Sequence, residues 1–218
     1  MDTNKQINRR QFLKTFGVTL GAAAVVGTAQ WALNEPDIQF PQESFGKEQT
    51  MQKILVAYAS KCGSTAEIAA AVGSTLAQTG FPVDVISAHL VKDLDSYPIV
   101  VLGTALRMEK PIPEMSDFVK KFRTVLQNKT LACFSAGVYM RSDTPENREK
   151  TMEFLTTMLS QLPPPISIGL FGGKVDLQKL SPFWRLLISQ DKSLMREGDG
   201  RDWTVINAWA EELSVQLA

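Results

Sequence analysis

From residue 51 onward, short apolar runs alternate with longer segments in which apolar side chains recur every three or four positions. Five of the apolar runs have the length of β-strands, and they lie at 53–58, 82–87, 99–102, 131–135 and 166–171. The spacing of the other segments predicts amphipathic helices at 64–78, 113–126, 145–162, 182–189 and 203–217. Strands that alternate with helices pair in parallel through right-handed crossovers. The pattern therefore predicts an α/β domain over residues 51–218, a doubly wound sheet with helices on both faces and strand order 2-1-3-4-5.

Residues 1–33 have a different pattern, with basic residues followed by an uncharged, mildly apolar stretch. Arg9 and Arg10 precede Phe-Leu-Lys, and no charged residue occurs from Thr15 to Leu33. A basic segment before an apolar one is typical of an export signal, and a membrane-spanning or membrane-surface helix is the alternative. The adjacent arginines resemble the twin-arginine signal, with Asn8 where that signal usually has Ser or Thr. The resemblance implies export across the cytoplasmic membrane.

Export by this route carries folded proteins, which suits a cofactor bound non-covalently inside the cell. No clean Ala-x-Ala precedes Asn34, so the exported protein is expected to be either soluble or tethered by an uncleaved leader. Residues 34–50, with two prolines and several polar residues, are typical of a linker.

Charge and cysteine content exclude several classes of protein. The 218 residues contain 23 basic and 23 acidic side chains. The leader has four basic residues and one acidic residue, so its net charge of +3 leaves −3 on the remainder. This balance argues against a nucleic-acid partner, which needs a basic surface. The two cysteines, Cys62 and Cys133, form no Cys-x-x-Cys pair, and no ligand cluster predicts a metal site.

The loop after the first strand is rich in hydroxyl groups and leads directly into a helix. It contains Ser60, Lys61, Cys62, Gly63, Ser64 and Thr65. Unpaired N–H groups at a helix start attract a phosphate, and the hydroxyls add donors. Neither a triphosphate P-loop nor a dinucleotide Gly-x-Gly-x-x-Gly motif is present. The spacing alone leaves two interpretations, a phosphate site or a plain N-cap by Ser64.

The residues around this loop resemble the flavodoxin signature. The matching positions are Val56, Tyr58, Ser60, Gly63, Thr65, Ala69 and Val72, and Ala57 replaces a larger apolar residue. The resemblance implies a flavodoxin-like fold and FMN as cofactor, with its monophosphate on residues 60–65. Lys61 is unusual in such a loop, where it either adds positive charge or extends into solvent.

Ligands of such sheets lie beyond the carboxyl ends of the strands, so the loops after the third and fourth strands are also candidates. The resemblance places Thr104, Ala105, Leu106 and Arg107 beside the flavin ring. No aromatic is present there, so Leu106 or Met108 would pack on the ring. Arg107 would either hold negative charge near N1 and O2 of the flavin or pair with Glu109.

The loop after the fourth strand contributes Ser135, Ala136, Gly137 and Tyr139. Tyr139 would stack on the flavin or contact its ribityl chain, and a plain surface aromatic is the alternative.

The wider sequence is similar to the quinone-dependent protoporphyrinogen oxidases of flavodoxin fold. The similarity lies in residues 103–107, 118–121, 172–174 and 202–210. It implies electron transfer through FMN to a quinone. Two features depart from that family, the export leader and a shorter, less basic loop after the fourth strand.

These features favour an exported FMN oxidoreductase that transfers electrons, in which the flavin and not a catalytic side chain carries the chemistry. Two alternatives remain, a protoporphyrinogen oxidase-like quinone-dependent enzyme and a non-enzymatic electron carrier. The expected partners are a quinone or a redox protein, and the apolar segment 183–188 offers a possible membrane-surface contact.

Overall fold

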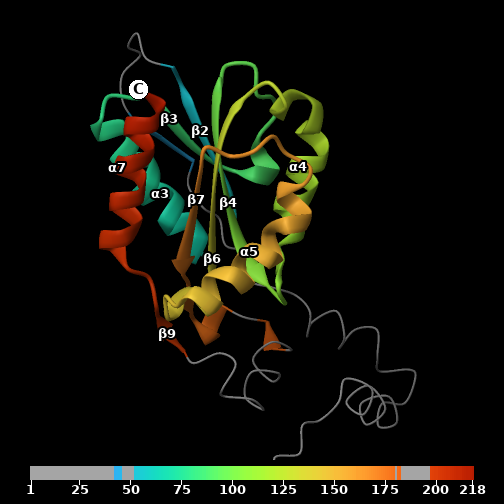
Figure 1. Ribbon diagram of the computed structural model, residues 1–218, viewed down its shortest axis with the longest axis vertical. Helices are drawn as coiled ribbons and strands as arrows, with labels where there is room; N and C mark the ends of the chain where they lie inside the picture. The colour runs from blue at the N-terminus through green and yellow to red at the C-terminus, as the bar shows by residue number, and fades with distance from the viewer. Residues whose placement is uncertain (1–41, 46–51, 180, 183–196) are drawn as a thin grey trace, which may run out of the picture.

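Parallel strands form the centre of the protein in the computed structural model, which describes residues 42–45, 52–179, 181–182 and 197–218 (Figure 1). The order across the sheet is β1-β3-β2-β4-β6-β7. The strands are β1 (Glu43–Phe45), β3 (Val83–Ser87), β2 (Ile54–Ala59), β4 (Ile99–Arg107), β6 (Thr130–Gly137) and β7 (Ser167–Gly172). The five strands from β3 to β7 are parallel neighbours, which confirms the predicted order 2-1-3-4-5.

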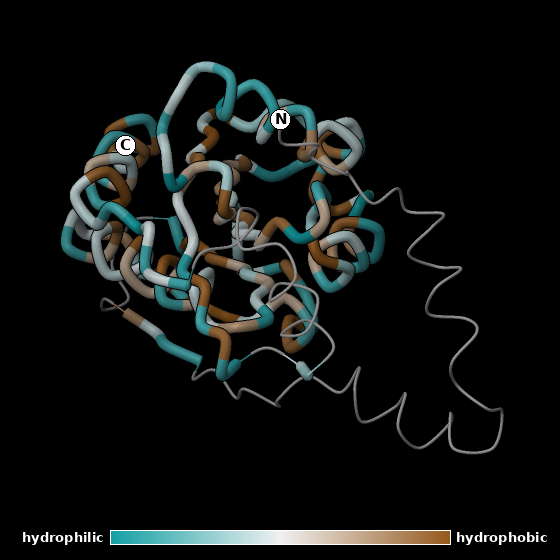
Figure 2. The backbone as a smooth tube through the Cα atoms, turned by 90° about the horizontal axis from the view of Figure 1, so that it is seen from below, coloured by the Kyte–Doolittle hydropathy of each residue, from teal (hydrophilic) through white to brown (hydrophobic). Residues whose placement is uncertain are grey.

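Helices cover both faces of this sheet, as predicted. Helices α3 (Ser64–Gln78) and α7 (Trp203–Leu217) pack on one face, and α4 (Pro113–Leu126) and α5 (Pro145–Leu159) pack on the other. Seen from below, they lie on either side of the central strands (Figure 2). None of the described helices has the length and apolar character needed to cross a membrane.

The central strand β2 explains why a continuous apolar run forms a strand here. All six of its residues are at most 2% exposed. Leu55 and Ala57 belong to the core beneath α4 and α5, whereas Ile54, Val56 and Tyr58 belong to the core beneath α3 and α7. A strand between two helical layers buries both faces, so it is apolar throughout and does not alternate.

Two predicted loops are wrong, because their residues continue the strands. Residues 103–107 extend β4, which turns back through Met108 and Glu109 into β5 (Lys110–Pro111). Both turn residues have positive φ, 50° and 62°, as a two-residue type I′ hairpin requires. Residues 135–137 likewise extend β6. The strands lengthen because Thr104 and Ala105 pair with Ser135 and Ala136.

Part of the predicted linker also belongs to the sheet. Residues 43–45 form β1, which pairs antiparallel with the edge strand β3. The Ser44 hydroxyl donates to Asp84 at 2.7 Å. This contact joins the segment that follows the leader to the domain. The leader, residues 34–41 and 46–50 of the predicted linker, and residues 183–189 of the predicted fourth helix lie outside the described residues.

Candidate functional site

The carboxyl ends of β2, β4 and β6 lie together at the lower edge of the sheet in Figure 1. The loop 60–63, the β4–β5 hairpin and the short helix η2 (Tyr139–Arg141) follow these three ends. Strands β8 (Lys174–Val175) and β9 (Gly198–Asp199) form a two-stranded ribbon after β7. The tertiary structure therefore brings the three predicted groups of site residues to one edge.

Gly63 sets the geometry of the loop after β2. It is the N-cap of α3 and has a φ of 92°, in the left-handed region that favours glycine. The first bond of the helix runs from the Glu67 N–H to the Gly63 carbonyl at 3.0 Å. The N–H groups of residues 64–66 therefore have no partner within the helix. Ser64 is the first helical residue and not the cap, so the interpretation of Ser64 as a plain N-cap is wrong.

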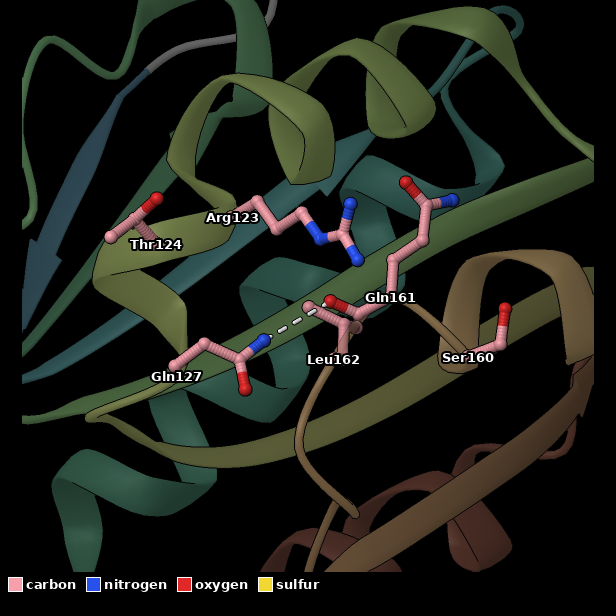
Figure 3. Close-up of a pocket in the computed structure, with 6 residues that line it drawn as sticks. All are labelled: Arg123, Thr124, Gln127, Ser160, Gln161 and Leu162. Atoms are coloured by element: carbon pink, nitrogen blue, oxygen red, sulfur yellow. Dashed lines mark hydrogen bonds between the residues drawn. The ribbon is translucent and has the colours of Figure 1, made fainter.

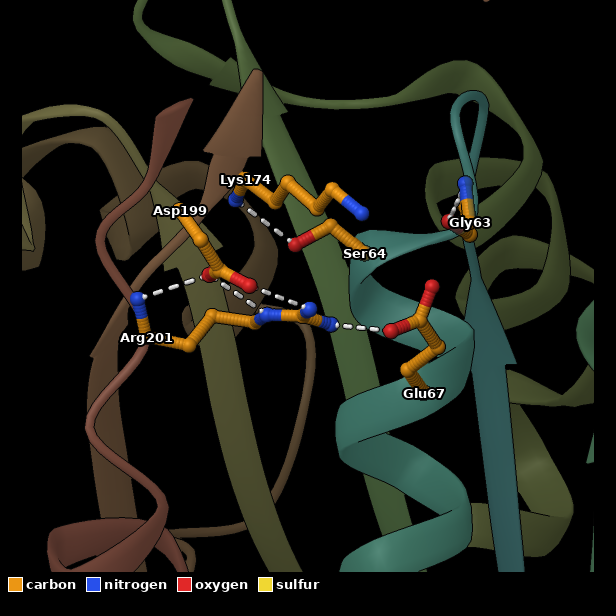
Figure 4. Close-up of polar contacts among 7 residues, drawn as sticks. Gly63, Ser64, Glu67, Lys174, Asp199 and Arg201 are labelled. Carbon is orange, nitrogen blue, oxygen red and sulfur yellow. Dashed lines mark hydrogen bonds and ion pairs between the residues drawn. The ribbon is translucent and has the colours of Figure 1, made fainter. Parts of the chain in front are cut away.

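Two serine hydroxyls in this loop are oriented by backbone donors. Ser60 Oγ accepts the Gly63 N–H at 3.1 Å, and Ser64 Oγ accepts the Lys174 N–H at 2.9 Å (Figure 4). A hydroxyl that accepts one bond still has its own proton to donate. Thr65 beside them is 1% exposed. Two pre-oriented O–H donors at a helix start are a donor set that fits a phosphate group.

Lys61 and Cys62 both contact other elements. The Lys61 ammonium forms an ion pair with Glu114 in the first turn of α4, and each side chain is 32% exposed. The charge of Lys61 is therefore already matched by a carboxylate. The Cys62 thiol donates to the Lys179 carbonyl at 3.6 Å. Cys62 and Cys133 are not joined by a disulfide, and burial raises the pKa of the Cys133 thiol to about 12.

Three of the predicted site residues on β4 and β6 are buried at the carboxyl ends of these strands. Thr104 and Ser135 are paired neighbours, and both side chains are completely buried. The Thr104 hydroxyl donates to the Ala105 carbonyl at 3.0 Å. Ser135 Oγ has no hydrogen-bond partner among the described residues. Ala136 is 4% exposed.

The end of β4 lies against the end of β6. A Cβ atom on Gly137 would lie 3.3 Å from the Leu106 Cβ, so these two predicted site residues are in close proximity. Arg107 lies opposite Lys110 in the hairpin. Met108 at the hairpin turn is 60% exposed. Contact of any of these residues with a flavin stays a prediction.

Tyr139 links the hairpin to α5. Its hydroxyl donates to Glu109 at 3.2 Å, and its ring packs edge-on against Phe154 with a centroid distance of 5.3 Å. Burial, followed by the bond to Glu109, raises the pKa of Tyr139. Tyr139 therefore contacts both the β4–β5 hairpin and α5. Neither predicted interpretation of Tyr139 included these contacts.

The sequence pattern did not predict a charged cluster that lies beside α3. The guanidinium of Arg201, 4% exposed, donates to Asp199 at 2.8 and 2.6 Å and to Glu67 at 2.6 Å (Figure 4). This cluster connects β9 to the first turn of α3. Glu67 lies 134 residues before Arg201 in the chain, and only the glycines on either side of Asp199 mark the later segment in the sequence.

Glycines allow this segment to approach the sheet. A Cβ atom on Gly172 would lie 1.9 Å from the Gly200 carbonyl oxygen, so only glycine fits there. The next residue, Gly173, donates to the Gly137 carbonyl at 3.1 Å and accepts from the Gly200 N–H at 3.2 Å. The connection from β7 to β8 therefore contacts both the end of β6 and the segment before α7.

A polar hollow of about 590 Å³ lies at the opposite end of α4 and α5 (Figure 3). It is lined by Arg123, Thr124, Gln127, Ser160, Gln161 and Leu162. Gln127 donates across it to the Gln161 carbonyl at 3.3 Å. It contains no predicted site residue. In the described part of the chain, no three His, Cys, Asp or Glu side chains group as metal ligands would.

Comparisons with known proteins agree with this geometry. Residues 55–201 match the family model of the flavodoxin domain. Protoporphyrinogen IX dehydrogenase [quinone] of Escherichia coli (strain K12) is 30% identical over 177 residues, which cover 74% of this chain and 94% of that protein.

Solved flavodoxins have a similar fold. A short-chain flavodoxin associated with a non-canonical PDU bacterial microcompartment aligns with a TM-score of 0.50 at 15% identity, covering 77% of this chain and all of that one. A flavodoxin of Streptococcus pneumoniae aligns with a TM-score of 0.48 at 18% identity, covering 75% of this chain and 99% of that one. The hydroxyl-lined start of α3 fits the phosphate of FMN, the cofactor of this family. The chain belongs to the flavodoxin-domain family, and its cofactor is FMN.

Proposed function

We propose that this chain is an exported FMN-dependent oxidoreductase that takes electrons from a small-molecule donor and passes them to a quinone. The observation that supports it most is the phosphate loop on a chain 30% identical to a quinone-dependent dehydrogenase. When bound, FMN supplies the redox chemistry.

The side chains of the protein bind and orient the FMN. The hydroxyls of Ser60, Ser64 and Thr65, together with the N–H groups that open α3, hold the phosphate. Leu106 offers an apolar contact for the ring in place of an aromatic, and Arg107 places positive charge near the N1 and O2 edge of the flavin.

The experiment is spectroscopic and kinetic. The full-length chain, purified from its native compartment, should have the absorption bands of oxidised flavin. It should also reduce a quinone at a rate that depends on a small-molecule donor, with protoporphyrinogen as the first donor tested. Flavin that exchanges electrons only with a protein partner would instead make the chain an electron carrier. A colourless protein that does not take up FMN would reject the proposal.

Export by the twin-arginine route is the second part of the proposal. It is supported by Arg9-Arg10 followed by Phe-Leu-Lys and a weakly apolar stretch. Replacing both arginines by lysine should retain the protein in the cytoplasm, whereas Lys5→Arg, a conservative change outside the Arg9–Lys14 motif, should leave export intact. Equal export of the two variants would reject this route. Fractionation of the exported wild-type chain then separates a soluble form from one tethered to the membrane.

A further inference from the structure

Lys174 lies against the start of α3, although 110 residues separate it from Ser64 in the chain. Its N–H donates to Ser64 Oγ at 2.9 Å. Its side chain extends across Ser64, with the ammonium end directed towards Gly63 (Figure 4). The long stem of a lysine therefore brings its charge to the loop that fits the phosphate.

Two other cations near this loop, Lys61 and Arg201, are already paired with carboxylates. Lys61 pairs with Glu114. Arg201 pairs with Glu67 and binds both oxygens of Asp199, the residue opposite Lys174 in the β8–β9 ribbon. Among the residues that the structure describes, the Lys174 ammonium forms no hydrogen bond or ion pair. It acts on Asp199 only through space, where the Arg201 hydrogen bond is the larger cause of the lowered pKa.

The balance of these charges favours a role for Lys174 in binding the phosphate. The pair of Lys61 and Glu114 is neutral, and the cluster of Arg201, Glu67 and Asp199 has a net charge of −1. Without Lys174, these five side chains would carry a net charge of −1 beside a doubly charged phosphate, and unit charges a few ångströms apart interact strongly at partly buried sites. With Lys174, the net charge of these side chains is zero, and the added cation is directed towards the loop (Figure 4).

We propose that Lys174 is a binding residue for the FMN phosphate and supplies the positive charge that the hydroxyls of the loop lack. The proposal rests on FMN binding at the start of α3. Ser64 connects the two roles, because its hydroxyl accepts from the Lys174 backbone and has a proton left for the phosphate.

The test compares flavins with and without the phosphate. The full-length apoprotein is titrated with FMN and with riboflavin, followed by quenching of flavin fluorescence. Lys174→Met should weaken FMN binding about tenfold or more, as expected for loss of a hydrogen bond to a charged group, and should change riboflavin binding little. Lys174→Arg should retain most of the FMN affinity. Lys120→Met is the matched control, since Lys120 is an exposed residue of α4 and its loss changes the net charge equally.

Inorganic phosphate provides a second readout that needs no flavin ring. At equal ionic strength it should raise the unfolding temperature of the wild type and of Lys120→Met above that in chloride. It should do so less for Lys174→Met, or for Lys174→Gln if the methionine variant does not fold. FMN binding by Lys174→Met that matches the Lys120 control would overturn the role of Lys174 while leaving the FMN site intact, and so would equal losses for FMN and riboflavin. A wild-type apoprotein that binds no FMN would overturn both.

Discussion

Asp84 connects the sheet to the segment that follows the leader, and removing its charge should loosen that connection. The carboxylate lies on β3 and is 8% exposed. It accepts from Ser44 of β1 at 2.7 Å and from the Tyr97 hydroxyl at 2.5 Å, and it pairs with Lys53 at 2.7 Å. A single carboxylate therefore holds three segments together.

The structure allows the cost of Asp84→Asn to be worked out. A hydrogen bond to a charged group contributes about 1.5–3 kcal/mol. The amide retains one acceptor oxygen, so one of the two hydroxyl bonds is lost and the other becomes weaker. The Lys53 side chain is 41% exposed, so its ion pair contributes less than about 1 kcal/mol. We expect the free energy of unfolding to fall by about 2–4 kcal/mol at pH 7.

The pH dependence gives an independent check. Burial on its own raises the pKa of Asp84, but the hydrogen bonds from Lys53, Tyr97 and Ser44 together outweigh it and hold this pKa below its usual value. The resulting stabilisation is complete above the unfolded-state pKa of about 3.9 and is lost as the pH falls through the lower folded-state value. The stability gap between wild type and Asp84→Asn should therefore narrow in acid.

Denaturant unfolding of the full-length chain at neutral pH, and at steps down to about pH 3, measures both effects. Asp117→Asn is the matched control, because Asp117 is an exposed residue on α4. An Asp84→Asn variant as stable as this control would refute the reasoning, as would a gap that stays constant in acid.

Three further substitutions, two of them with a matched control, test the β7–β8 connection, the loop before α3 and the charged cluster of Arg201. Gly172→Ala puts a Cβ 1.9 Å from a backbone oxygen and should cost about 1–3 kcal/mol or more, while Gly173→Ala, whose nearest neighbour would be at 3.5 Å, should unfold at the wild-type temperature. Gly63→Ala and Gly80→Ala replace glycines with φ of 92° and 104° and should each cost about 1–2 kcal/mol. Only Gly63→Ala should also weaken FMN binding in a fluorescence titration, and equal binding by the two would contradict the placement of the loop. Arg201→Met removes a guanidinium bonded to two half-exposed carboxylates; denaturant unfolding should detect a loss of about 1.5–3 kcal/mol, and a loss below about 0.5 kcal/mol would show that the cluster contributes little.

The architecture follows from local patterns. Apolar runs such as 54–59 can be satisfied only between two helical layers, and the apolar positions of 64–78 and 113–126 lie on one face of a helix. The strand order, those two helices and the loop that begins α3 were therefore predictable from residue spacing, with the resemblance to flavodoxins giving FMN.

Contacts between distant segments were not predictable in this way. Residues 103–107 resemble a loop in isolation. They become strand because 103–105 pair with residues 134–136 of β6 and 106–107 pair with β5. Lys61 is the obvious cation in the sequence of the loop, yet it forms an ion pair with Glu114. Lys174 lies beside the same loop, although more than a hundred residues separate the two in the chain. Periodicity reports which face of an element is buried, so it determines the layers of this domain. It carries no information on which charges meet across the layers, because that depends on strand pairing and side-chain reach, and these are decided only when the sheet is assembled.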